Sequence, residues 1–175
     1  MINRNNDSTR LMLGDFSDMS LVGTTLYVLD WRLGRVDAML LNSNGQTIEH
    51  KKGVTIGKAY VPSEYNSIQA TDKWLYIGQY KDNSILKLPI TDNKLGSCYK
   101  VQSFTRNLKG PIICGVDKEG TLLIADEFNH RLRTSSENEE WGSIDFKFDQ
   151  PADAFIYKGL LFVETGSGLV VHNTQ

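Results

Sequence analysis

The sequence predicts an all-β fold, a β-propeller of about four blades in which each blade is a four-stranded antiparallel sheet. A strand, a polar turn and a second strand recur four times, and the first leucines of the four copies are separated by 49, 47 and 39 residues. This spacing is close to the roughly 40 to 50 residues of a propeller blade. No window of ten or more residues has a helical period, whereas short β-branched and aromatic runs recur between turn signals.

The repeated segments are "LYVLDWRLGRV" from Leu26, "LYIGQYKDNSI" from Leu75, "LLIADEFNHRL" from Leu122 and "LFVETGSGLV" from Leu161. Another short apolar strand precedes each one: "DMSLVG", "YNSIQAT", "PIICGVD" and "PADAFIY". Turns such as "DKEG" join the two strands, because Gly and Asp supply the backbone angles that tight hairpins need. Each unit therefore begins with an antiparallel hairpin.

Later segments complete the first three units: "VDAMLL" and "QTIEHK", "ILKLPI" and "SCYKVQSF", "RLRTSS" and "SIDFKF". The fourth unit has no outer strand after "GLVVHNTQ", and residues 9–14 ("TRLMLG") could fill that gap and cover its bare edge. We expect blades near 15–52, 62–105, 110–149 and 150–175, with residues 1–8 as a flexible tail. The blades either close into a ring or belong to a larger, six-bladed propeller.

Composition places the chain among ordinary globular proteins, with 40% hydrophobic and 23% charged residues. A net charge of -2 gives no global field that attracts a polyanion. The start of the sequence lacks the apolar run of a signal peptide, and no stretch reaches the roughly 20 apolar residues that span a bilayer. We therefore expect a cytoplasmic protein without a membrane partner. Cys98 and Cys114 are too few for a disulfide scaffold.

The third unit, "GPIICGVDKEGTLLIADEFNHRLR", resembles an NHL repeat. That repeat runs Pro, apolar strand, Asp, Gly, apolar strand, Asp and Asn-His-Arg, which here are Pro111, Asp117, Gly120, Asp126 and Asn129-His130-Arg131. The other units match the motif less closely: the first keeps Asp30 and Arg35, the second has Gln79 and Ser84, and the fourth has Thr165. The resemblance implies a platform that binds protein or RNA, and related propellers include amidating lyases and gluconolactonase-like hydrolases.

The polar turn residues have a structural interpretation. Asp126 and Arg131 flank one turn, so that the carboxylate can accept turn N–H groups while the arginine reaches back across the hairpin. Asp30 and Arg35 recur at the same spacing. Because active sites are not normally repeated in every unit, we interpret Asp30, Asp126 and Asn129 as structural turn residues.

Catalytic and metal chemistry have weaker support in the sequence. His130 has no ligand-like spacing to His50 or His172. Carboxylates near a propeller axis can bind Ca²⁺, and the candidates are Glu64, Glu127, Asp153 and Glu164. No nucleophile elbow or phosphate loop is present. We predict no catalytic residue, metal ligand or cofactor. The alternative is a metal-dependent hydrolase or lyase of the gluconolactonase-like or NHL-like propeller type, with Ca²⁺ as the candidate ion.

The strongest functional signal is a shared face. In an antiparallel blade the loops after the second and fourth strands leave on the same side, so the four repeated turns lie together. Aromatic and arginine side chains there are typical of interaction surfaces. The predicted partner-binding residues are Trp31, Arg32, Arg35, Tyr80, Lys81, Phe128, His130 and Arg131. We predict a non-enzymatic module for a protein or peptide.

Single-stranded RNA is the alternative ligand of the same face, because stacking rings combine there with basic residues. The basic residues of the neighbouring loops are Lys51, Lys52, Lys58, Arg106 and Lys109. The oligomeric state stays open: the blades could close alone, recruit another copy of the chain, or be part of a larger ring.

Overall fold

The computed structural model describes residues 16–31, 33–55, 65–91, 94–95, 99–100, 107–117, 119–136 and 141–174. Over these residues the chain is all-β apart from one 3-10 turn, η2 (Glu127–Asn129). The expected tail, residues 1–8, and the expected closing strand, residues 9–14, lie outside the described residues.

Four antiparallel sheets follow one another along the chain, and we call them blades 1 to 4. Blade 1 has the order β1 (Phe16–Val22), β2 (Thr25–Asp30), β3 (Arg35–Leu41), β4 (Thr47–Thr55). Blade 2 contains β5 (Tyr65–Ala70), β6 (Trp74–Gln79) and β7 (Ser84–Thr91), and both β8 (Lys94–Leu95) and β9 (Tyr99–Lys100) pair with β7.

Blades 3 and 4 repeat the same meander. Blade 3 has the order β10 (Pro111–Val116), β11 (Leu122–Asp126), β12 (Arg131–Ser135), β13 (Trp141–Lys147). Blade 4 contains the three strands β14 (Asp153–Tyr157), β15 (Leu160–Thr165) and β16 (Gly168–Asn173).

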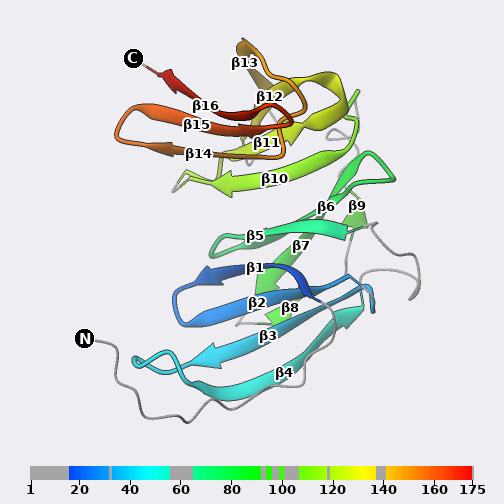
Figure 1. Cartoon of the computed structure of the whole chain (residues 1–175). Helices are drawn as coiled ribbons and strands as arrows, with labels where there is room; N and C mark the ends of the chain where they lie inside the picture. The colour runs from blue at the N-terminus through cyan, green and yellow to red at the C-terminus, as the bar shows by residue number, and fades with distance from the viewer. Residues whose placement is uncertain are drawn as a thin grey trace.

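The blades stack in chain order, with their first strands side by side (Figure 1). β1 packs on β5, β5 on β10, and β10 on β14. Figure 1 shows blade 1 at the bottom of the view and blades 3 and 4 at the top. The predicted β-propeller architecture is confirmed, and the first and last blades lie at opposite ends of it.

The core lies between consecutive blades. In blades 2 to 4 the repeated strand turns two apolar side chains toward the preceding blade. These side chains are fully buried: Leu75 and Ile77, Leu122 and Ile124, and Leu161 and Val163. The intervening positions point toward the following blade, as Tyr27 and Tyr76 do. Burying each Leu or Ile contributes about 1.5–3 kcal/mol, so the contacts between blades provide most of the stabilisation.

Side chains also link the first strands of neighbouring blades. Asp18 accepts a hydrogen bond from the Ile68 N–H at 2.8 Å, and the Ser67 Oγ accepts one from the Ile113 N–H at 2.9 Å. Asp18 pairs with Leu29 and Ser67 pairs with Gly78, one residue before the end of β2 and β6. The two acceptors therefore occupy equivalent positions, and they satisfy N–H groups that an inner edge would otherwise leave bare.

Candidate interaction face

The turns between the second and third strands share one backbone geometry. The residue just before the third strand has a positive φ in each of blades 1 to 3: 56° at Gly34, 51° at Asn83 and 55° at His130. Glycine and asparagine adopt this conformation readily, and histidine does so less often. His130 is held there because its N–H donates to the Glu127 carbonyl at 3.0 Å and its Nδ1 accepts from the Gln150 N–H at 3.2 Å.

The blade 3 turn is organised around the buried carboxylate of Asp126. Arg131 Nε donates to it at 2.7 Å, the Lys109 N–H at 2.7 Å and Asn129 Nδ2 at 2.9 Å. Arg131 and Asn129 also donate to the carbonyl of Asn107. Because Asn107 and Lys109 precede blade 3, the network fixes the turn to the loop that enters the blade.

The blade 1 turn uses a different pairing. Arg35 donates to Asp37 at 2.8 Å, and Asp30 Oδ1 accepts the Leu33 N–H at 2.9 Å. The clamp expected between Asp30 and Arg35 is therefore not the bond that forms. Asp37 lies two residues along the same strand, on the face that Arg35 occupies, and is fully buried. The guanidinium of Arg35 therefore bonds Asp37, while the carboxylate of Asp30 accepts an N–H group of the turn.

Two aromatic rings meet at the junction of blades 2 and 3. The rings of Tyr80 and Phe128 lie edge to face with centroids 5.5 Å apart. Phe128 lies over Gly110, where an added Cβ would come within 2.9 Å of the ring. Burial, followed by the hydrogen bond and negative charge of Glu127, raises the pKa of Tyr80 to about 12. Phe128 is nevertheless 47% exposed.

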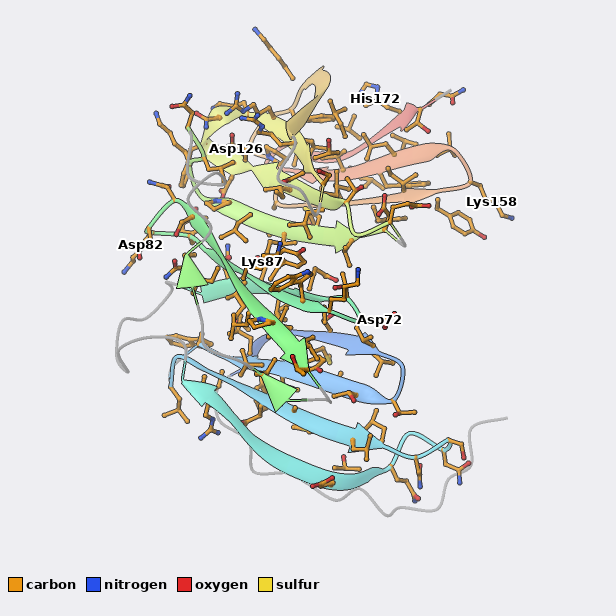
Figure 2. All side chains as sticks on the ribbon, turned by 180° about the vertical axis from the view of Figure 1, so that it is seen from behind. Asp72, Asp82, Lys87, Asp126, Lys158 and His172 are labelled. Atoms are coloured by element: carbon orange, nitrogen blue, oxygen red, sulfur yellow. The ribbon has the colours of Figure 1, made fainter. Side chains whose placement is uncertain are left out.

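The predicted partner-binding residues that the structure describes lie in the turns after β2, β6 and β11 or at the first residue of the next strand. Figure 2 shows Asp82 and Asp126, which mark the turns of blades 2 and 3, at one end, and Asp72 at the other. Trp31 and Arg35 are half-buried, whereas Lys81 and His130 are exposed. Arg32 lies outside the described residues, as do the side chains of the expected basic rim except Lys109.

A second feature lies at the opposite end of the blades. A cleft of about 460 Å³ is lined by Asp72, Lys73, Trp74 and Glu119, among others. Next to it, the buried Lys87 places its Nζ 4.2 Å from the centre of the Trp74 ring and 5.6 Å from that of Tyr76. Sequence reasoning missed this cluster, and its only signal was a lysine inside the apolar run "ILKLPI".

Acidic and thiol groups approach one another along the first strands. Burial raises the pKa of Asp18, hydrogen bonds from the Ile68 and Met19 N–H groups oppose the shift, and the charge of Asp153 adds to it. Burial, and then the charge of Asp153, raise the pKa of the Cys114 thiol to about 12. Asp153 of blade 4 thus acts on side chains of both blade 1 and blade 3.

The described residues contain no group of three or more His, Cys, Asp or Glu side chains placed to hold a metal ion. Of the Ca²⁺ candidates, Glu127 bonds Tyr80 and Glu64 lies outside the described residues. The described part of the chain also has no helix long and apolar enough to cross a membrane.

Solved structures with a similar fold support the propeller architecture. The computationally designed Ika4 protein aligns with a TM-score of 0.57 at 10% identity, over 93% of this chain and 92% of that one. A chain of a nidogen/laminin complex aligns with 0.66 at 15% identity, over 94% and 62%, and a streptogramin B lyase with 0.58 at 12%, over 93% and 56%. The chain thus spans about three fifths of the length of these last two. At such identities the likeness concerns the fold alone.

No protein-family model matches the sequence, and no curated protein matches it either.

Proposed function

We propose that the chain is a non-enzymatic, NHL-like binding module that engages a protein or peptide through the face bearing the β2–β3, β6–β7 and β11–β12 turns. The observation that carries the proposal is Phe128, which is 47% exposed at the tip of a turn fixed by the Asp126 network. Its ring rests against Tyr80 and Gly110. A ring held in place before binding loses little conformational freedom on complex formation, and aromatic anchors dominate interface energetics.

The surroundings of Phe128 fit an anchor inside a polar rim. Lys81, Asp82 and His130 are exposed on the same turns, and Arg131 is half-buried beside them. Productive interfaces combine an apolar centre with such a rim. Because the carboxylates of Asp82 and Glu127 offset the nearby cations, the face suits a peptide of mixed charge better than a polyanion such as RNA.

The similar solved structures agree with a binding role without specifying it. One is a chain from a nidogen/laminin complex, and another, at 16% identity and a TM-score of 0.59, is an auxiliary nutrient binding protein from Bacteroides thetaiotaomicron. Because propellers of one architecture serve unrelated functions, the specific role must come from the residues of the face.

Selection from a random peptide library displayed on phage tests the proposal. We expect enriched peptides to lose at least about tenfold in affinity for Phe128→Ala, because truncating a central aromatic anchor typically costs more than 1.4 kcal/mol. The matched control is Ile156→Ala, which truncates an apolar side chain that is 57% exposed on blade 4. Both variants should keep the wild-type circular dichroism. Peptides that depend on Ile156 and ignore Phe128 would place binding elsewhere and contradict the proposal.

A further inference from the structure

Blade 4 ends in an exposed apolar sheet face, which we call the blade 4 outer face. Its exposed members come from all three strands: Phe155, Tyr157, Leu160, Leu169 and Val171. Phe155 pairs across the sheet with Phe162, and the two rings stack with centroids 4.7 Å apart. Leu169 is 67% exposed. Soluble monomers rarely expose a contiguous apolar patch of this kind.

The internal repeat indicates what surface fits this face. Phe162 is the second residue after the start of β15, and occupies the position of Tyr27 in blade 1 and Tyr76 in blade 2. Both tyrosines are 1% exposed, because the next blade covers them. In each case two apolar side chains of the repeated strand in the next blade pack on the tyrosine. For Tyr27 these side chains are Leu75 and Ile77.

Blade 1 carries that covering surface without a described blade in front of it. Leu26 and Val28 occupy the positions of Leu75 and Ile77. Together with Phe16, Met19 and Met39 they line an apolar cleft of about 440 Å³, in which Phe16 and Met19 are exposed, Leu26 is half-buried, and Val28 and Met39 are buried at its floor. We call this surface the blade 1 front face. Figure 1 shows the strands of blade 1 and those of blade 4 at opposite ends of the molecule.

A hydrogen bond between the first strands of neighbouring blades follows the same repeat. Asp153 pairs with Glu164, one residue before the end of β15, so it occupies the position that Asp18 and Ser67 hold in blades 1 and 2. Those two side chains accept the N–H of the following blade at Ile68 and Ile113. The equivalent N–H of blade 1 belongs to Met19. Asp153 is exposed; within the chain its Oδ1 accepts the N–H of its neighbour Ala154 at 2.8 Å, and its carboxylate also bonds the Cys114 thiol. The Met19 N–H donates to its own neighbour Asp18 at 2.8 Å.

We propose that the blade 4 outer face binds the blade 1 front face of a second copy of this chain, so that two copies close one ring through two identical interfaces. Each interface follows the packing seen between consecutive blades, with Phe162 against Leu26 and the exposed Met19, and with Asp153 accepting the Met19 N–H. A contact between different faces forms a ring if the rotation closes. Two four-bladed copies give eight blades, within the range of about four to eight that propellers adopt.

Light scattering after size-exclusion chromatography, over a range of micromolar concentrations, tests the proposal. The wild-type chain should approach twice its 19.7 kDa mass. Leu169→Glu and Met19→Glu should each weaken association by at least about a hundredfold, because each places an unpaired charge in an apolar contact. The matched control is Ile156→Glu: Ile156 is 57% exposed and adjoins Phe155, but points to the opposite side of β14. It should leave the mass unchanged.

Mixing the two variants distinguishes this arrangement from others. The Leu169→Glu chain keeps an intact blade 1 front face and the Met19→Glu chain an intact blade 4 outer face, so the mixture should form a two-chain species that neither forms alone. Loss of association in Leu169→Glu but not in Met19→Glu would mean that blade 4 pairs with itself. That result, or a wild-type chain that stays monomeric because something else covers the face, overturns the proposal. Neither outcome bears on Phe128.

Discussion

The thiol of Cys114 offers a quantitative test of the environment around the first strands. Burial and the charge of Asp153 raise its pKa from 9.0 to about 12. At pH 8 roughly a tenth of a thiol with the ordinary pKa is thiolate, against about one part in ten thousand at a pKa of about 12. The thiolate fraction therefore falls about a thousandfold.

Nucleophilicity partly offsets this loss. A more basic thiolate attacks disulfides faster, with a Brønsted coefficient of about 0.4–0.5. Over three pKa units this raises the rate constant of the thiolate roughly twentyfold. The net expectation is a reaction about fifty times slower than that of an ordinary thiol. Cys114 also lines a cleft of about 330 Å³, so a small disulfide reagent has a route to it.

The assay is the absorbance change of an aromatic disulfide reagent at pH 8, in a Cys98→Ser background so that only Cys114 reacts. The same chain unfolded in urea gives the reference rate. Asp153→Asn should accelerate the folded reaction, because it removes the negative charge that helps to raise the pKa of Cys114. A folded rate within about fivefold of the unfolded rate, or no effect of Asp153→Asn, would refute the reasoning.

Four further predictions concern the turn face. Glu127→Gln should lower the pKa of Tyr80 from about 12 toward 10, measured by NMR titration. Since the folded value is the higher one, Tyr80 favours folding below pH 10, and this contribution should be lost as pH rises from about 10 to 12, as urea unfolding at each pH would reveal. Asp126→Ala should reduce the free energy of unfolding by about 2–4 kcal/mol in the same assay, because it leaves buried donors unpaired. Gly110→Ala should cost about 1–3 kcal/mol in urea unfolding, because its φ is +61° and the new Cβ would displace the ring of Phe128.

The blades were predictable because each is a local unit. Successive leucines at the start of the repeated strand, such as Leu75 and Leu122, are both buried between blades, so one packing requirement recurs at a regular interval in the sequence. The bond between Asp126 and Arg131 was also within reach of sequence reasoning, since the two residues face each other across one tight turn. The spacing of these residues in the sequence is therefore enough to predict the blades, without knowledge of any long-range contact.

The contacts that the sequence did not predict are of two kinds: a choice between two nearby partners, and contacts between residues far apart in the sequence. Arg35 has two acidic candidates within five residues, and only the three-dimensional burial of Asp37 decides between them. Lys87 meets Trp74 and Tyr76 through the register of β6 and β7, in which Tyr76 pairs with Lys87. The approach of Asp153 to Cys114 and Asp18 joins three blades, and no local pattern records it.

The two proposed binding surfaces can operate independently because they lie at different kinds of position. Phe128 sits at a junction between blades 2 and 3, which one chain completes by itself. The blade 4 outer face and the blade 1 front face belong to the first and last blades, whose strands lie at opposite ends of the molecule (Figure 1). Ring closure would therefore leave Phe128 exposed and present it twice on one assembly.

A ligand carrying two copies of a selected peptide, joined by a linker that spans the ring, should then bind the wild-type chain more tightly than the single peptide by about a hundredfold or more. Leu169→Glu should remove this gain without changing the affinity for the single peptide, which calorimetry with both ligands would measure. A gain that survives Leu169→Glu would contradict the link between closure and avidity.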